Sequence, residues 1–237
     1  MDMSGNSKFR PQGDHIQAAQ LNLYRSQHAG FSLVELLVVV TIVVILSAMA
    51  IPGIIGSMHM SRLRGAANDY AGLLEQTRIY AIRDNRYYST YILAPSGGAP
   101  VGLVYVDMLP KSLTGASGNG GTSVAAGDPV ITISSEVVQQ PAASAPNTGN
   151  LKTQLLPSTT PVAPKDTSAT VATFGPRGLP CTPLSLPGGS LCDSSGGPTA
   201  FWTFLENVNS GSWQAVTITP AGRIQKWYYT GSAWSKL

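Results

Sequence analysis

The feature that most constrains this chain is an apolar run at residues 31–51, FSLVELLVVVTIVVILSAMAI. Glu35 is the only charged residue among these 21 residues. An α-helix rises 1.5 Å per residue, so a helix of this length spans about 30 Å, the hydrocarbon thickness of a bilayer. β-branched residues dominate the run and disfavour a helix in water, but in lipid the backbone must satisfy its own hydrogen bonds. The run therefore predicts a membrane-spanning helix.

Glu35 is the anomaly in this run. A carboxylate inside a membrane helix costs roughly 2.5–3.5 kcal/mol on insertion scales, so such a residue usually has a partner or a function. It lies near the N-terminus of the expected helix, where the helix dipole favours an anion, and a free amino group at Phe31 would stabilise it further. Taken alone, Glu35 fits equally well a plain membrane anchor that tolerates one acidic residue near its end.

The residues around Glu35 favour a more specific interpretation. The segment Gly30-Phe31-Ser32-Leu33-Val34-Glu35 resembles the processing site of type IV prepilins and type II secretion pseudopilins. In that family an aspartyl peptidase of the membrane cuts after the glycine and N-methylates the new N-terminal residue. The resemblance implies that residues 1–30 are a leader ending at Gly30, that Phe31 becomes the methylated N-terminus, and that Glu35 meets the amino terminus of a neighbouring subunit.

The same resemblance gives a role to Pro52 and a location to the chain. Family helices often kink at the proline 21 residues after the first mature residue, and Pro52 stands at that distance from Phe31. Residues 31–51 would cross the inner membrane once, with the leader in the cytoplasm and the head in the periplasm or outside. Two features depart from the family pattern: the leader is 30 residues long, and Gln27-His28-Ala29 stands where a basic residue is common.

An alternative interpretation of the run is a secretory signal peptide. The segment Ala48-Met49-Ala50 resembles a signal peptidase site, and cleavage after Ala50 would release a soluble domain beginning near Ile51. Against this, the apolar run exceeds the usual length of about 7–15 residues, and the region before it is long and barely basic. A signal peptide also leaves Glu35 unexplained.

After Pro52 the sequence predicts an amphipathic helix over residues 52–84. Apolar and small residues recur at alternating spacings of four and three, which places them on one helical face, while most charged residues lie off that face. We expect this face to pack on the globular head. Its members are Leu63, Ala67, Tyr70, Leu74, Thr77 and Ala81.

Residues 85–237 predict a β-rich head with Gly-, Ser- and Pro-rich exposed loops at 112–129, 139–168 and 175–199. The segment Pro220-Ala221-Gly222 suits the turn of a hairpin. The chain is therefore expected to be an α+β protein, one long helix packed on an antiparallel sheet. The expected strands are Tyr87–Leu93, Val101–Val106, Val130–Val138, Ala169–Phe174, Ala200–Glu206, Trp213–Thr219 and Arg223–Tyr229.

The two cysteines, Cys181 and Cys192, lie in the third of these loops. Zinc requires more ligands at tighter spacing than the chain supplies, so no metal site and no cofactor are expected. The cysteines predict a disulfide that closes a short loop, which requires an oxidising compartment. Two unpaired thiols are the alternative.

Two C-terminal motifs narrow the resemblance. The segment Phe174-Gly175-Pro176-Arg177-Gly178 and the later hairpin over 218–224, with Gly222-Arg223 at its turn, are similar to motifs of the GspH/FimT branch of minor pseudopilins and minor pilins. The branch implies a minor subunit that primes or caps a fibre.

The sequence offers little for catalysis. Beyond the leader His59 is the only histidine, and the chain contains no G-x-S-x-G, phosphate-binding glycine loop or H-E-x-x-H motif. We therefore do not expect an enzyme.

A second hypothesis is a minor pilin that contacts DNA during DNA uptake. Basic groups neutralise phosphates and aromatic faces stack on bases, and the chain ends in a segment where the two alternate. The alternative is that Trp227 and Tyr229 fill the core while Arg223 lies in solvent. The residues expected at the DNA are Arg223 and Lys226, near Lys236 and interleaved with Trp227, Tyr228, Tyr229 and Trp234.

The main hypothesis is a structural subunit, a minor pilin or pseudopilin. Its expected partners are the prepilin peptidase, other pilins or pseudopilins along the N-terminal helix, and the membrane. The sequence leaves open whether the machine is a type IV pilus or a type II secretion system.

Overall fold

The computed structural model describes residues 31–93, 103–107, 124, 126–156, 163–182, 192 and 199–237. The proposed leader, Gly30 included, lies outside these residues, as do most of the loop expected at 112–129 and the middle of the loop expected at 175–199. The chain divides into two compact units, residues 1–52 and 53–237, which are described separately.

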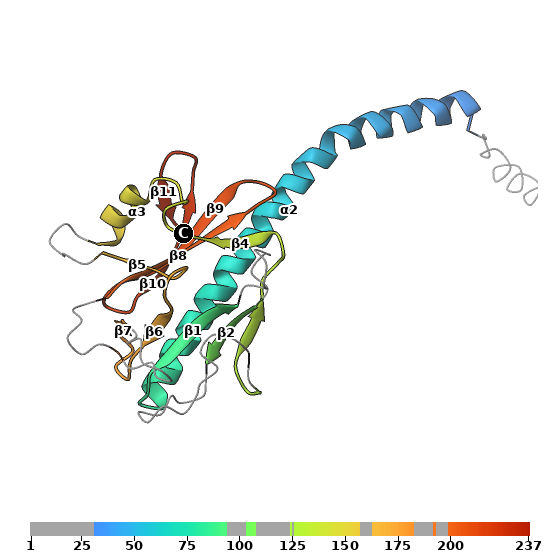
Figure 1. Cartoon of the computed structure of the whole chain (residues 1–237). Coiled ribbons are helices and arrows are strands. Elements are labelled where there is room, and N and C mark those ends of the chain that lie inside the picture. The colour runs from blue at the N-terminus through green and yellow to red at the C-terminus, as the bar shows by residue number, and fades with distance from the viewer. Residues whose placement is uncertain are drawn as a thin grey trace, which may run out of the picture. The chain divides into compact units, whose positions relative to one another are not determined.

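One helix, α2 (Leu33–Arg83), contains both the apolar run and the amphipathic segment (Figure 1). Its 51 residues continue through Pro52, so this proline does not end the helix, and the predicted kink stays a prediction. By length and composition, α2 contains a stretch that could cross a membrane, and none of that stretch is buried.

In the second unit, α2 buries the face that the spacing predicted. Tyr70 shows how this face meets the head: its hydroxyl accepts a hydrogen bond from Thr203 at 3.1 Å, and burial raises the pKa of Tyr70 to about 12. Arg64, Asp69 and Glu75 lie off this face and are exposed. Each side chain of the predicted face is at most 1% exposed: Leu63, Ala67, Tyr70, Leu74, Thr77 and Ala81.

The strands of the head form two sheets. The first has five strands in the order β3-β2-β1-β6-β7, and the second has β11-β10-β9-β8-β4, with β5 parallel to β8. All other pairings are antiparallel. Sheet one contains β1 (Tyr88–Leu93), β2 (Leu103–Asp107), β3 (Val130–Thr132), β6 (Ala172–Phe174) and β7 (Pro180–Cys181). Sheet two contains β4 (Val137–Gln140), β5 (Lys165–Asp166), β8 (Phe201–Asn207), β9 (Ser212–Ile218), β10 (Ile224–Tyr229) and β11 (Trp234–Lys236).

The second sheet is covered on both faces. Side chains alternate along a strand, so neighbours in sequence enter different clusters. Phe201 and Leu205 of β8 join the core that includes the buried face of α2, whereas Phe204 joins a second cluster. That second cluster contains Ala145, Leu151, Phe204, Ala215, Trp227 and Trp234.

Two predictions about the middle of the chain are wrong. The single strand expected at Val130–Val138 is two strands, because Ser134–Glu136 form a turn closed by Val137 N–H to the Ser134 carbonyl at 2.9 Å. The two halves then enter different sheets.

The loop expected at 139–168 is also wrong in part, because it contains helix α3 (Thr148–Leu155) and strand β5. Leu151 and Leu155 lie one helical turn apart and are both buried, Leu151 beside Phe204 and Trp234. This burial stabilises a short helix. The Pro-, Ser- and Asn-rich sequence around it indicated a loop, so the helix was not predicted. Strands β7 and β11 were likewise not predicted from the sequence.

Candidate processing and assembly segment

The candidate site begins where α2 begins. Ser32 precedes the helix, its carbonyl accepts from Leu36 N–H at 3.1 Å, and its hydroxyl accepts from Val34 N–H at 3.4 Å. This is the geometry of an N-cap, in which a side-chain oxygen satisfies a helix N–H that has no intrahelical partner. The serine of the Gly30–Glu35 motif therefore starts the helix two residues after Gly30.

Glu35 lies in the first turn of α2. The spacing Ser32-x-x-Glu35 is that of a capping box. This sequence signal was not used to predict where the helix begins. No hydrogen bond or ion pair joins Glu35 to the described part of the chain, and the side chain is exposed. The helix dipole favours a carboxylate here.

The rest of the apolar run presents its side chains outward on every side of the helix. Leu33, Val44 and Met49 are 79%, 60% and 78% exposed. Thr41 satisfies its hydroxyl within the helix, donating to the carbonyls of Leu37 at 3.0 Å and Val38 at 2.8 Å. A helix that is apolar on all sides requires lipid or neighbouring apolar helices around it.

Residues 25–51 match the family model described as the prokaryotic N-terminal methylation motif. The N-terminal segment of the chain is type IV pilin-like. The match spans the Gly30–Phe31 junction, the capping serine and Glu35, and it ends one residue before Pro52.

No curated protein sequence matches the chain. Among solved structures, the chain is similar to the type IV minor pilin FimU of Pseudomonas aeruginosa, with 16% sequence identity and a TM-score of 0.40. That similarity covers 70% of this chain and 88% of the FimU chain.

The two cysteines form the predicted disulfide. Cys181 of β7 is bonded to Cys192, with 5.4 Å between their Cα atoms. The described residues contain no free cysteine. The bond ties the end of sheet one to the segment that leads toward β8.

The two C-terminal motifs meet at one residue of α2. Arg78 donates from Nε to the Gly178 carbonyl at 3.1 Å, and Gly222 packs against the same carbonyl. Both glycines have positive φ, 70° and 78°. A Cβ at Gly222 would lie 2.6 Å from the Gly178 oxygen, and a Cβ at Gly178 would lie 2.6 Å from Cδ1 of Ile82. The motifs therefore fix two turns of the head on α2.

His59 takes part in a polar cluster that the sequence did not predict. Glu136 accepts from His59 Nδ1 at 2.8 Å and from Arg62, and the amide of Asn207 lies 3.4 Å from the same carboxylate. Asn207 also donates to the His59 carbonyl at 3.3 Å. These contacts, with the His59 hydrogen bond as the largest cause, lower the pKa of Glu136. The cluster ties the turn before β4 and the end of β8 to α2.

The residues expected at DNA differ in their contacts and exposure. Lys226 donates to Asn68 Oδ1 of α2 at 2.6 Å, and Arg223 lies exposed beyond the turn. Trp227 and Trp234 are 3% and 2% exposed and donate to Thr217 Oγ1 and the Pro146 carbonyl, so their faces are not open for base stacking. DNA contact stays a prediction.

In the described part of the chain, no three His, Cys, Asp or Glu side chains are grouped so that they could hold a metal ion.

Proposed function

We propose that this chain is a minor pilin or pseudopilin that is cleaved after Gly30, N-methylated on Phe31 and assembled through its N-terminal helix. The observation that carries the proposal is the coincidence of the methylation motif at 25–51 with a capped, outward-facing apolar helix. Glu35, exposed in the first turn of that helix, supplies the carboxylate that would meet a neighbouring amino terminus.

The proposal includes a location and an order of events. Residues 31–51 hold the precursor in the inner membrane as a single span, with the head in the periplasm or outside. The Cys181–Cys192 disulfide supports an oxidising compartment for the head. The prepilin peptidase is the first partner, and other pilins or pseudopilins follow, with Pro52 as the proposed kink.

A processing experiment tests this proposal. The full chain, produced in membranes with a prepilin peptidase, is compared with a Gly30→Asp variant by intact mass. We expect the unsubstituted chain to lose residues 1–30 and the variant to stay uncut, because the peptidase of the resembled family cuts after glycine. Equal processing of both chains, or cleavage after Ala50, would contradict the proposal.

A further inference from the structure

Arg64 differs from the other three arginines of α2. Arg62 pairs with Glu136, and Arg78 and Arg83 also have carboxylate partners. Arg64 is exposed, and its side chain forms neither an ion pair nor a hydrogen bond with the described residues. The described part of the chain therefore supplies a carboxylate for every arginine of α2 except Arg64.

Arg64 lies in a groove along α2 that is rich in hydrogen-bond donors. The groove has a volume of about 650 Å³, within the range of ligand sites, about 300–1,000 Å³. Gly65 leaves space in it, because a Cβ built there would meet nothing within 4 Å. Its lining, all of it in the described part of α2, contains no carboxylate. The lining residues are Ser57, Met60, Ser61, Arg64, Gly65 and Asn68.

A second cation lies at the edge of the groove. Lys226 donates from Nζ to Asn68 Oδ1 at 2.6 Å, and Asn68 is one of the lining residues. Two cations and two serine hydroxyls are thus gathered on one side of α2. Phosphate oxygens accept strong, charge-assisted hydrogen bonds from arginine, whose planar guanidinium can bind two of them at once. The chemistry of the groove fits a phosphate group.

The groove begins where the apolar surface of α2 ends. Ile54 and Met58 are exposed, as are the apolar side chains of residues 31–51. Ile54 precedes Ser57 by three residues and Ser61 by seven, so these three positions lie on one side of the helix. Along that side the surface changes from apolar side chains to hydroxyls and then to a cation. A phospholipid changes in the same order, from its acyl chains to its phosphate.

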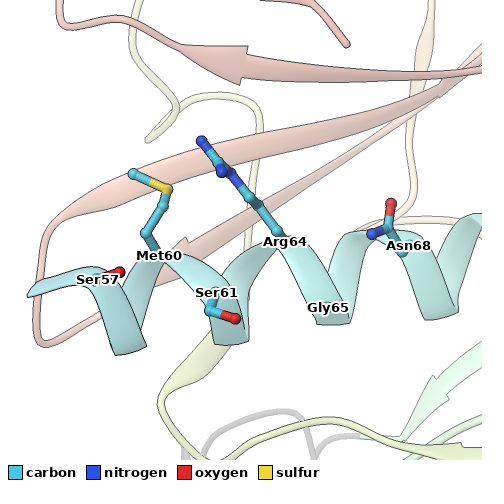
Figure 2. Close-up of a pocket in the computed structure, with 6 residues that line it drawn as sticks. All are labelled: Ser57, Met60, Ser61, Arg64, Gly65 and Asn68. Carbon is cyan, nitrogen blue, oxygen red and sulfur yellow. The ribbon is translucent and has the colours of Figure 1, made fainter. Parts of the chain in front are cut away.

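The direction of the Arg64 side chain agrees with this order. In a helix each Cα–Cβ bond tilts toward the N-terminus. Figure 2 shows Arg64 leaning toward the Met60 and Ser57 end of the groove. Arginine commonly extends an apolar stem along a surface in this way and places its charged group at a polar boundary. The guanidinium therefore points toward the end of the groove where the apolar side chains begin.

We propose that this groove binds the phosphate of an anionic membrane phospholipid. Arg64 binds the phosphate oxygens, the hydroxyls of Ser57 and Ser61 donate to them, and an acyl chain lies along Ile54. The inference rests on the proposed function, in which the precursor is held in a membrane. DNA offers the same phosphodiester oxygens, but it would not cover the exposed apolar side chains beside the groove, whereas an acyl chain removes them from water. The bound lipid fixes the depth of α2 in the bilayer before assembly.

Native mass spectrometry of the full chain in detergent tests the proposal. Phosphatidylglycerol is added in one series, and in another a diacylglycerol with the same acyl chains but no phosphate. We expect the chain to retain one phosphatidylglycerol and no diacylglycerol. Arg64→Gln should lower the affinity for phosphatidylglycerol about tenfold, because hydrogen bonds to a charged group are lost. Arg64→Lys keeps the charge and should lose less.

The matched control is Arg86→Gln. Arg86 is exposed and follows the end of α2, so its replacement removes the same charge away from the groove. We expect the control to bind phosphatidylglycerol as the unsubstituted chain does. If Arg64→Gln and Arg86→Gln bind it equally well, or if diacylglycerol is retained as well as phosphatidylglycerol, the inference is overturned.

A single-stranded oligothymidylate tests the other source of a phosphodiester. If it binds and is lost in Arg64→Gln while phosphatidylglycerol binding is unchanged, the lipid is the wrong ligand. The chain is produced with a prepilin peptidase, so the same spectra report its N-terminus by mass. A chain that is cleaved after Gly30 but binds lipid without dependence on Arg64 overturns this inference alone. An uncleaved chain contradicts the proposed function, and its lipid binding still tests the groove.

Discussion

Glu35 is a carboxylate within α2, whereas Glu136 contacts α2 from the turn before β4, and their surroundings give them different roles. Glu136 is held by His59, Arg62 and Asn207, so its charge is neutralised inside the head. Glu35 receives no such contact from the described residues and lies in the first turn of an outward-facing apolar helix. Under the proposed function, its partner is supplied by another subunit.

Replacement of Glu35 tests that role. We expect Glu35→Ala to be cleaved after Gly30 and inserted in the membrane as before, because the apolar run is unchanged. Incorporation into fibres should be lost, since the amino terminus of the neighbour then lacks its carboxylate. The measurement compares the membrane and fibre fractions, with Thr41→Ser as a control in the same helix. If the Glu35→Ala chain enters fibres at the normal level, the proposed role of Glu35 is contradicted.

Glu136 predicts a dependence of head stability on acid. Its pKa is lowered in the folded chain, so it adds stability above its ordinary pKa of about 4.3, and this contribution is lost as the pH falls through the lowered folded value. We expect the Tm of the full chain in detergent to fall over that acidic window. The Glu136→Gln chain should show a smaller fall over the same window. An identical pH profile for both chains would contradict the assignment.

Among the elements, α2 was predicted best from the sequence, because its apolar residues recur with the helical period of 3.6 residues. The six residues of the predicted face, the first of which is Leu63 and the last Ala81, recur at that period and are buried. Helix α3 and strand β11 were missed because their few buried residues, Leu151 and Trp234 among them, are separated by turn-forming sequence. The prediction of one strand at 130–138 is wrong because the Ser134–Glu136 turn contains no glycine or proline that would mark it in the sequence.

The candidate site was readable only where it is local in sequence. The Gly30–Glu35 motif lies in six consecutive residues, and its capping serine could also have been found there. The Glu136 cluster joins residues 77 positions apart, and the Arg78 contact with Gly178 joins residues 100 apart. Pairings at such distances depend on how the sheets fold onto α2.

The contact of two turns with Arg78 predicts that Gly→Ala costs more folding stability at Gly222 than at Gly211. Gly222 and Gly211 both have positive φ, so Gly→Ala at either position should cost about 1–2 kcal/mol from backbone strain. A Cβ at Gly222 also collides with the Gly178 carbonyl, whereas one at Gly211 meets nothing within 4 Å. We expect Gly222→Ala to cost about 1–3 kcal/mol more than Gly211→Ala, from overpacking. Denaturant unfolding of both variants checks this, and equal losses would count against the contact.

At the scale of the whole molecule, the two units of the chain require different surroundings. The head buries its own core, including the second cluster around Phe204 and Trp234. The apolar half of α2 buries nothing within the described chain, so its side chains require lipid or other helices. Under the proposed function, the apolar half of α2 lies first in the membrane and later among the apolar helices of an assembly.

The most direct test of this account is the N-terminal residue and intact mass of the protein purified from the membranes of its host. The account predicts a chain that begins at Phe31 and carries one N-methyl group. A chain that begins near Ile51, or one that retains residues 1–30 in the presence of an active prepilin peptidase, would contradict it.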